Sequence, residues 1–392
     1  MITKTFSKNI ERLNAFISET TGAGIPGIDK FASYSFSRRE TLDPGTLESL
    51  YSDNDIAATI VERIVKDALR EGYGLAWQGA DDTIVRRTVD WAEARYEVTQ
   101  VLQQARIYSR LFGGGAVFIG ADDDRELDQA VEPGFPVEFL RAHSSEDLRP
   151  RAWYADVAQQ NFHKVALYDL SLPTFAQAQT RATKQGVSRI VDHSRLVTLD
   201  GVRTTDKRFR ERGWGESVLR RVYDVLLKFE ASFASIQHSL AESSIPVYKV
   251  EGLMNLLASE NWEPLQDRFQ LINTSKSNYQ AIVLDKDETF ERVAAQLQEA
   301  ANVVEAAMLR VAGAAGMPAT ILFGRSPAGL NATGQSDLEV WHGAVAQEQS
   351  LVLAPAIREL YTFLLAQEGS PTGGVIPEGL KVTFPSLWTP LT

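Results

Sequence analysis

Cysteine is absent from all 392 residues. This absence excludes disulfides, thiolate metal sites, iron–sulfur clusters and cysteine nucleophiles, and it favours an intracellular, reducing origin. Long hydrophobic runs are missing as well, since no apolar stretch approaches the roughly 18–20 residues that cross a bilayer. The first residues also lack the apolar core of a signal peptide. We therefore expect a soluble protein that makes no membrane contact.

Basic residues are fewer than acidic residues. Forty Lys and Arg stand against 51 Asp and Glu, which gives a formal net charge of −11. A protein that binds nucleic acid tightly by neutralising phosphates needs the opposite sign. We therefore expect any contact with DNA to be weak and non-specific.

The rest of the composition is that of an ordinary folded protein. Hydrophobic residues make up 44% of the chain and charged residues 23%, so neither disorder nor a fibrous composition fits. A chain of this length predicts two or three packed units with a sizeable core.

Apolar residues at helical spacing predict several helices. The expected helices cover residues 55–69, 82–111, 216–243, 293–312 and 336–365. Ser336 and Glu339 fit a capping box at the start of the last helix, and Pro355 should kink it.

Short alternating stretches predict strands between and beside these helices. We expect strands at 116–120, 137–140, 164–168 and 195–199, and a compact insert at 245–292 with strands at 247–250 and 279–284 around a helix at 259–272. Residues 1–49 read as an N-terminal arm and 204–212 as a charged loop. The fold class is therefore α+β, mainly helical.

One segment comes close to a phosphate-binding loop. Residues 329–336, GLNATGQS, carry Gln335 where the motif requires lysine, and a loop broken by Pro and Gly precedes them instead of a buried strand. We interpret the segment as a flexible loop that ends in a helix. Gly113–Gly115 lies at a helix-to-strand junction, the reverse of a dinucleotide fingerprint, and predicts a helix stop.

No catalytic, metal or cofactor set emerges from the sequence. The five histidines are isolated, without the spacing of a zinc site. A two-histidine phosphoesterase needs two H-x-S/T motifs; His143 begins one, whereas His193 does not. The cationic side chains of the charged loop could touch phosphate, but the interrupting acids favour a solvated loop or a salt-bridged subunit contact. These cations are Lys207, Arg208, Arg210 and Arg212.

The order of the parts resembles the portal proteins of tailed bacteriophages. A long helix entered through Trp214–Ser217 is followed by a small α/β insert, an Ala-rich helix, a loop rich in Gly and Pro and a long kinked helix. The most specific stretch is Phe323–Asp337 with the helix that follows it, and Asp55–Arg70 and Ala105–Gly115 support the resemblance. The likeness covers about residues 50–367.

The resemblance implies a ring, usually of twelve subunits, at one vertex of the capsid. Double-stranded DNA would be pumped in through this ring during packaging and leave through it at ejection. The implied partners are the large terminase subunit as motor, a head–tail adaptor and the major capsid protein. The implied location is the virion, after assembly in the bacterial cytoplasm. An acidic lumen wall agrees with a channel that passes DNA without holding it.

The resemblance also divides the chain into the wing, stem and clip of a portal. The expected regions are a wing at 50–214, stem helices at 215–244 and 293–317, a clip at 245–292, a tunnel loop at 318–335, a wing helix at 336–367 and a C-terminal tail at 368–392. Expected channel residues are Arg325, Ser326, Leu330, Asn331, Thr333 and Gln335. Expected partner-binding residues at the clip are Asp285, Lys286, Asp287 and Glu288.

Two other classes of protein remain open. An enzyme of nucleotide or phosphoester chemistry needs an acid, base or metal set. A head–tail adaptor would share the acidic character but is usually much shorter. We expect no enzymatic activity.

Overall fold

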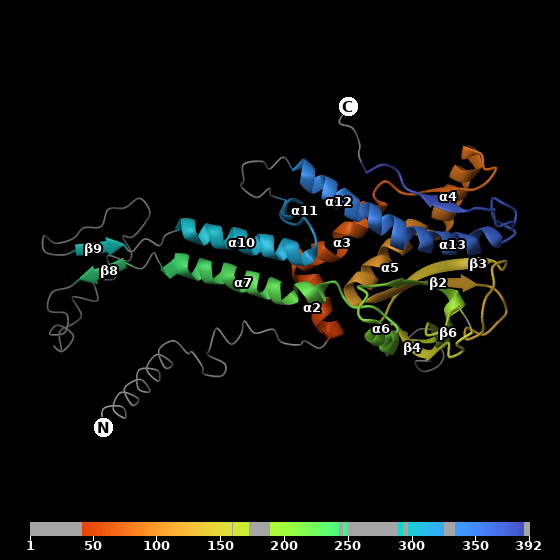
Figure 1. The fold of residues 1–392 in the computed structure, drawn as a ribbon, viewed down its shortest axis with the longest axis horizontal. Helices are drawn as coiled ribbons and strands as arrows, with labels where there is room; N and C mark the ends of the chain where they lie inside the picture. The colour runs from red at the N-terminus through yellow and green to blue at the C-terminus, as the bar shows by residue number, and fades with distance from the viewer. Residues whose placement is uncertain are drawn as a thin grey trace, which may run out of the picture. The chain divides into compact units, whose positions relative to one another are not determined.

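The structure is a computed structural model that describes residues 41–158, 160–171, 189–242, 246–249, 289–292, 297–324 and 334–387. Helices and strands are mixed along the chain (Figure 1), as the predicted α+β class requires. The expected helix at 259–272, the expected strand at 279–284 and nearly all of the expected arm lie outside the described residues.

Two helices open the described chain. Helix α2 (Pro44–Asp53) begins inside the range expected for the arm, with Pro44 at its first position, where a missing N–H costs nothing. Asn54 then caps α3 (Asp55–Leu69), because its side-chain oxygen accepts a hydrogen bond from the Ala57 amide at 2.8 Å. The apolar stripe of α3 is buried, which confirms the predicted helix.

The single helix predicted at 82–111 is two helices, α4 (Asp82–Tyr96) and α5 (Val98–Phe112). They part at Glu97, whose φ of 50° is left-handed. The carboxylate of Glu93 accepts hydrogen bonds from both the amide and the hydroxyl of Thr99, so the end of α4 caps the start of α5. The apolar pattern resumes after one residue, which is why periodicity alone misses the break.

Two three-stranded antiparallel sheets follow. The first has the order β3-β2-β7, with β2 (Gly114–Ala121) between β3 (Val137–Ser144) and β7 (Leu196–Asp200). The second has the order β4-β5-β6, formed by Leu148–Trp153, Val165–Leu170 and Arg189–Asp192. The strands expected at 116–120, 137–140, 164–168 and 195–199 are present, whereas β4 and β6 were not foreseen.

Glycines let α5 approach β2 closely. Gly113 ends α5 with a φ of 96°, which confirms the predicted helix stop. At Gly115 a Cβ atom would lie only 2.2 Å from the carbonyl oxygen of Ala105 on α5. Only glycine fits that contact.

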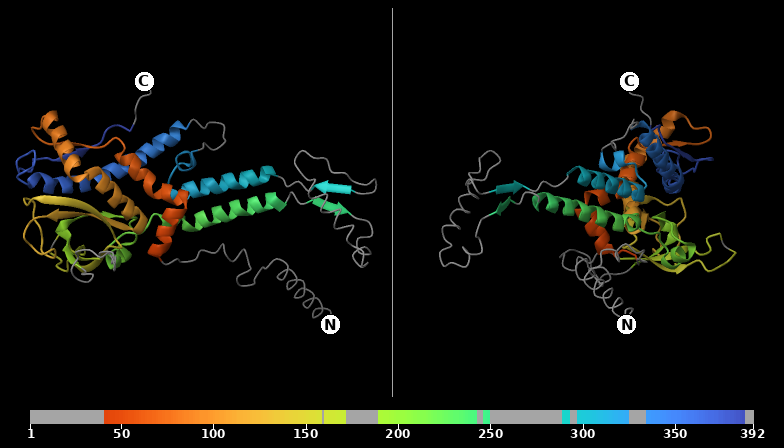
Figure 2. Two further views of the ribbon diagram at one scale, coloured as in Figure 1. Left: turned by 180° about the vertical axis from the view of Figure 1, so that it is seen from behind. Right: turned by 60° about the vertical axis from the view of Figure 1, so that its left-hand side comes forward.

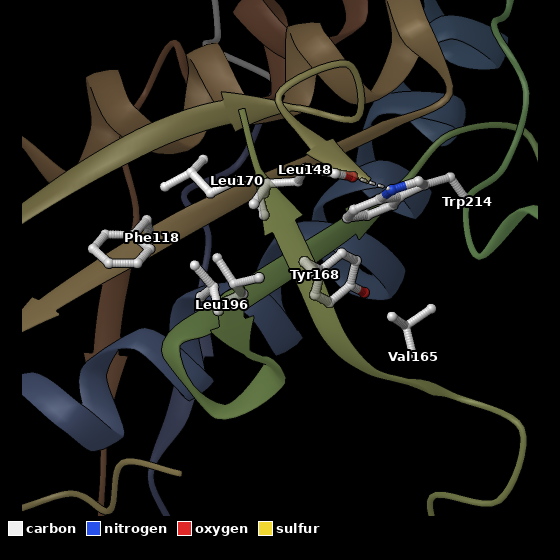
Figure 3. Packing of buried hydrophobic residues seen from close by; sticks show 9 residues of the cluster. Phe118, Leu148, Val165, Tyr168, Leu170, Leu196 and Trp214 are labelled. Carbon is white, nitrogen blue, oxygen red and sulfur yellow. Dashed lines mark hydrogen bonds between the residues drawn. The ribbon is translucent and has the colours of Figure 1, made fainter. Parts of the chain in front are cut away.

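A buried cluster joins the two sheets (Figure 3). Trp214 lies at one end of the cluster, donates its indole N–H to the carbonyl oxygen of Leu148 at 2.9 Å and packs against Tyr168. The other buried members are Ala116, Phe118, Leu148, Val165, Leu170, Val191 and Leu196. The entry to the following long helix is therefore anchored in the core.

The segment predicted as a charged loop contains a helix, α6 (Asp206–Arg212). Its C-cap is Gly213 in the left-handed conformation, with a φ of 71°. Apolar periodicity does not predict α6, because nearly all of its side chains are charged and the helix has no apolar stripe.

Two long helices, α7 (Leu219–Glu242) and α10 (Leu297–Ala315), lie side by side (Figures 1 and 2). They start and end within a few residues of the predicted limits. Beyond their far ends the strands β8 (Pro246–Lys249) and β9 (Thr289–Arg292) pair antiparallel. The pairing brings the two ends of the predicted insert together.

The long C-terminal helix contains a π-helical turn just before Pro355, the residue at which a kink is predicted. Helix α12 (Gln335–Glu348) passes through the π-helical turn η3 (Gln349–Leu353) into α13 (Ala354–Ala366), with Pro355 in the first turn of α13. The predicted capping box is wrong, because α12 begins at Gln335 with Gly334 at the N-cap and no side-chain cap bond.

The chain after α13 pairs with a strand from the N-terminal half of the sequence. Strand β10 (Lys381–Thr383) pairs antiparallel with β1 (Gly74–Ala76), with Val382 opposite Leu75. The segment expected as a C-terminal tail is thus in part a strand of the folded unit.

Candidate functional site

The expected channel loop is only partly described. Arg325, Ser326, Leu330, Asn331 and Thr333 lie outside the described residues, and Gln335 is the exposed first residue of α12. The first part of the expected loop is instead a short helix, α11 (Ala319–Phe323), which ends at Gly324 with a φ of 67°.

The two ends of this loop are tied together. The hydroxyl of Thr320 on α11 donates to Asp337 Oδ2 on α12 at 3.0 Å. On the other side, the ring of Phe323 lies 6.0 Å from that of Phe229 on α7. Helices α11 and α12, which flank residues 325–333 in the sequence, are therefore joined to each other, and α11 contacts α7.

The helix that follows the loop is fixed to the rest of the protein by buried polar contacts. Gln349 donates to the carbonyl oxygen of Ala68 at 2.8 Å, and the Trp341 indole N–H donates to Asp67 Oδ2 at 2.9 Å. Both partners lie on α3. These two bonds join α12 and the π-helical turn after it to α3.

A buried ion pair adds to this attachment. Arg106 on α5 binds both carboxylate oxygens of Glu348, with Nη2 to Oε2 at 3.0 Å, and its Nη1 donates to the carbonyl oxygen of Asp200. Both side chains are more than nine-tenths buried. Sequence reasoning missed the pair, because nothing in a sequence marks two residues that are 242 positions apart as partners.

A second charged cluster lies where α7 begins. The buried carboxylate of Glu216 has the guanidinium groups of Arg208 and Arg212 at 3.6 Å and is bonded to Arg220 as well. Two of the arginines expected in a solvated loop therefore face a carboxylate of their own chain. Neighbouring arginines and burial lower the pKa of Arg220, with burial the larger cause.

The partner-binding residues expected at the clip, Asp285–Glu288, lie outside the described residues. What the structure describes is the base of that insert. Pro246 pairs with Arg292 and Lys249 with Thr289, so the base is a two-stranded ribbon that continues the helix pair.

The helix pair exposes large apolar side chains. On α7, Leu227 is 45% exposed and Phe233 44%; on α10, Val303 is 54% exposed and Leu309 47%. The described residues of both helices are buried only near the ends that meet the rest of the protein, at Leu219, Val222 and Leu226 and at Val311 and Ala312. Apolar helix faces of this kind mark surfaces that pack against another molecule.

The described residues contain no group of three or more His, Cys, Asp and Glu side chains that could hold a metal ion. The Nδ1 atom of His143 lies 3.9 Å from Oδ2 of Asp147, and the same oxygen accepts a hydrogen bond from the Ser144 hydroxyl. Within the same residues, no helix is long and apolar enough to span a membrane.

Three curated proteins are similar to this chain in sequence. An anti-CBASS protein Acb1 of Caulobacter sp. (strain RHG1) is 25% identical over 90% of this chain and 56% of its own length. An anti-CBASS protein Acb1 of Sphingomonas paeninsulae is 26% identical over 84% of this chain and 52% of its own length. A Haemophilus influenzae protein of uncharacterised function is 25% identical over 81% of this chain. The chain thus spans about half the length of the two anti-CBASS proteins.

Solved structures share the fold. A chain from the neck of the native gene transfer agent (GTA) particle, computed with C12 symmetry, matches 90% of this chain with a TM-score of 0.54 and 16% identity, over 87% of its own length. A chain from the neck of the empty particle, computed with C6 symmetry, matches 90% of this chain and 88% of its own length with a TM-score of 0.54 and 14% identity. At such identities the likeness concerns the fold alone.

A family model covers almost the whole chain. The model is described as "Phage portal protein" and matches residues 46–391, from within α2 to beyond β10. The match includes the helix pair, the insert and the interrupted C-terminal helix together. The chain belongs to the phage portal protein family.

Proposed function

We propose that this chain is the subunit of a ring at one capsid vertex, the conduit through which double-stranded DNA is packaged and later ejected. The observation that carries the proposal is the family match over residues 46–391, which takes in a pair of long helices with exposed apolar faces. In this assignment the wing is 50–214 with 336–367, the stem 215–244 and 293–317, the clip 245–292 and the tunnel loop 318–335.

The ring follows from the stem helices. Leu227 and Phe233 on α7 and Val303 and Leu309 on α10 are each about half exposed in the single chain, and neighbouring exposed apolar side chains suit contact with another subunit. Heterologous contacts between identical subunits cover such faces and close into a ring when the rotation permits. We propose twelve subunits, in agreement with the C12 symmetry of the similar gene transfer agent neck.

We assign the contact with DNA to the tunnel loop. The support for this assignment is that the flanking helices α11 and α12 are joined through Thr320 and Asp337, and that Phe323 of α11 contacts Phe229 of the stem helix α7. Arg325 supplies a cation, and Ser326, Asn331, Thr333 and Gln335 supply polar groups, with Leu330 between them. At a net charge of −11 per subunit the contact is weak and reversible.

The clip meets the partners that act at the capsid vertex. We assign the large terminase subunit and then the head–tail adaptor to its charged residues Asp285, Lys286, Asp287 and Glu288, and the major capsid protein to the outer surface of the wing. Charged contacts give fast, exchangeable binding, which suits two partners that succeed one another. The antiparallel pairing of β8 and β9, at the two ends of the range 245–292, supports a clip that begins and ends at one point.

Two relatives are named anti-CBASS proteins, and the portal family match does not explain that name. This chain spans 56% and 52% of their lengths, and the portal family model accounts for residues 46–391 of it. We propose that the role in their name belongs to the part of those proteins that this chain does not match. The family match favours the conduit over the two alternative functions, a nucleotide or phosphoester enzyme and a head–tail adaptor.

A deletion in the tunnel loop tests the proposed conduit. Removing residues 326–334 should leave assembly of the ring intact but lower the DNA content of the particles, measured by quantitative PCR of nuclease-protected genomes. A deletion of Val375 and Ile376, exposed residues between α13 and β10, serves as the control. Unchanged DNA content in the loop deletion would contradict a role of the loop in the channel.

A further inference from the structure

The wing contains a pocket to which portal function assigns no role. It has a volume of about 610 Å³, within the range of sites that hold small molecules. Its walls come from β5, β7, α6 and α13 and from the turn at His193. We call it the α6 pocket.

Three exposed cations lie around the α6 pocket. Lys164 comes from the turn before β5, Arg203 from the segment after β7 and Arg210 from α6. The short helix α6 thus presents Arg208 and Arg212 toward Glu216 and Arg210 toward the pocket. In a chain of net charge −11, this local excess of positive charge favours an anion.

The pocket lining also contains two carboxyl groups, those of Asp200 and Glu359, which would oppose an anion if both were charged and unpaired. Burial raises the pKa of both Asp200 and Glu359 above the ordinary values. Arg203 acts on Asp200 and Lys164 acts on Glu359, so each carboxylate has a cation of the pocket beside it. The rim therefore remains a site for negative charge.

Flat aromatic rings share the pocket with the cations. Phe162 and Phe209 are both half-buried, and the Phe162 ring lies 3.7 Å from the ring of His163. The guanidinium of Arg203 lies 5.5 Å from the centre of the Phe209 ring. Aromatic and guanidinium planes are the surfaces on which nucleobases stack.

The aromatic and cationic surface continues beyond this pocket. A second hollow of about 360 Å³ shares His163 and Arg210 with it and adds the exposed ring of Trp153. His163 itself has a φ of 68°, which is uncommon for a residue other than glycine. Its imidazole contacts Arg210 at 3.2 Å, so the shared wall is fixed by a side-chain bond.

We propose that the α6 pocket binds a mononucleotide. Lys164 and Arg210 hold the phosphate through charge-assisted hydrogen bonds, and the base stacks on Phe209 and Arg203. His193 also lines the pocket, where its ring stacks against that of Tyr168 with the ring centres 6.3 Å apart, and burial lowers its pKa. This site is separate from the tunnel loop and does not depend on the channel function.

Isothermal titration of the purified full-length protein tests the proposal with two probes, adenosine monophosphate and inorganic phosphate, at about 0.15 M salt. Adenosine monophosphate should bind about tenfold more tightly than phosphate, because only the nucleotide stacks. The double substitution Lys164→Ala and Arg210→Ala should weaken both probes by about tenfold or more, and Phe209→Leu should weaken the nucleotide alone.

Arg221→Ala provides the matched control, because Arg221 is an exposed arginine of α7 outside the pocket. It should bind both probes as the wild type does. An azido-adenosine monophosphate probe should cross-link to peptides that contain residues 160–165 or 206–213. Absence of binding at millimolar nucleotide, equal affinities for the two probes, or a cross-link elsewhere would overturn the proposal. None of these outcomes bears on whether the protein forms rings.

Discussion

At the scale of single residues, buried ion pairs join elements that are far apart in the sequence. Arg106 and Glu348 connect α5 to the end of α12, and Arg195 and Asp123 join the turn before β7 to the segment after β2. Each pair is satisfied by further bonds to backbone carbonyls. A buried pair of this kind contributes little net stability while it is intact and costs much when one partner is lost.

Glu348→Ala should therefore destabilise the folded subunit by about 3–5 kcal/mol, because the guanidinium of Arg106 stays buried without its carboxylate. Urea unfolding followed by circular dichroism measures the change. Glu339→Ala, on the exposed face of the same helix, is the control and should stay within about 0.5 kcal/mol of the wild type. Equal stabilities of the two variants would show that the pair does not fix α12.

Asp123 makes the stability depend on pH in acid. Burial alone would raise its pKa, but the hydrogen bond and the charge of Arg195 together lower it below the ordinary value. The unfolded state then binds the proton more readily, so the contribution is fully present above about pH 4 and is lost as the pH falls through the lower folded value. Thermal unfolding between pH 7 and pH 3 should show a shallower acid slope for Asp123→Asn than for the wild type. Identical slopes would contradict this role of the pair.

At the scale of elements, the sequence pattern predicts what is amphipathic and misses what is not. The stripe of α3 and the long helices α7 and α10 follow from apolar spacing, and the first sheet follows from short apolar runs bounded by turn residues. Helix α6 is too polar to be detected, and the break at Glu97 leaves the apolar period intact. The contacts that join α12 to α3 and α5 link distant positions, which a single sequence does not record.

Close packing of α5 on β2 gives a test at this scale. Gly115→Ala would place a Cβ atom 2.2 Å from the carbonyl oxygen of Ala105, so the helix must move, at a cost of about 1–3 kcal/mol or more. Gly313→Ala, on α10, meets nothing within 4 Å and should stabilise by about 0.5–1 kcal/mol. Denaturant unfolding of both variants checks the signs, and a neutral Gly115→Ala would refute the close approach.

At the scale of the whole molecule, most of the described core lies outside the helix pair, and α7 and α10 expose apolar side chains that we assign to contacts between subunits. The double substitution Val303→Asp and Leu309→Asp should prevent ring formation yet leave the subunit folded, because both side chains are exposed in the single chain. Light scattering and circular dichroism separate the two effects. Val375→Asp, exposed outside the stem, should assemble normally, and rings formed by the double variant would exclude α10 from the subunit contact.

Electron microscopy of the purified full-length protein tests the central claim most directly. The account predicts closed rings with a central channel wide enough for duplex DNA, with stems formed by α7 and α10 around the channel and twelve subunits in each class average. Particles the size of one 43.4 kDa chain in every buffer, with no ring in any class average, would contradict it.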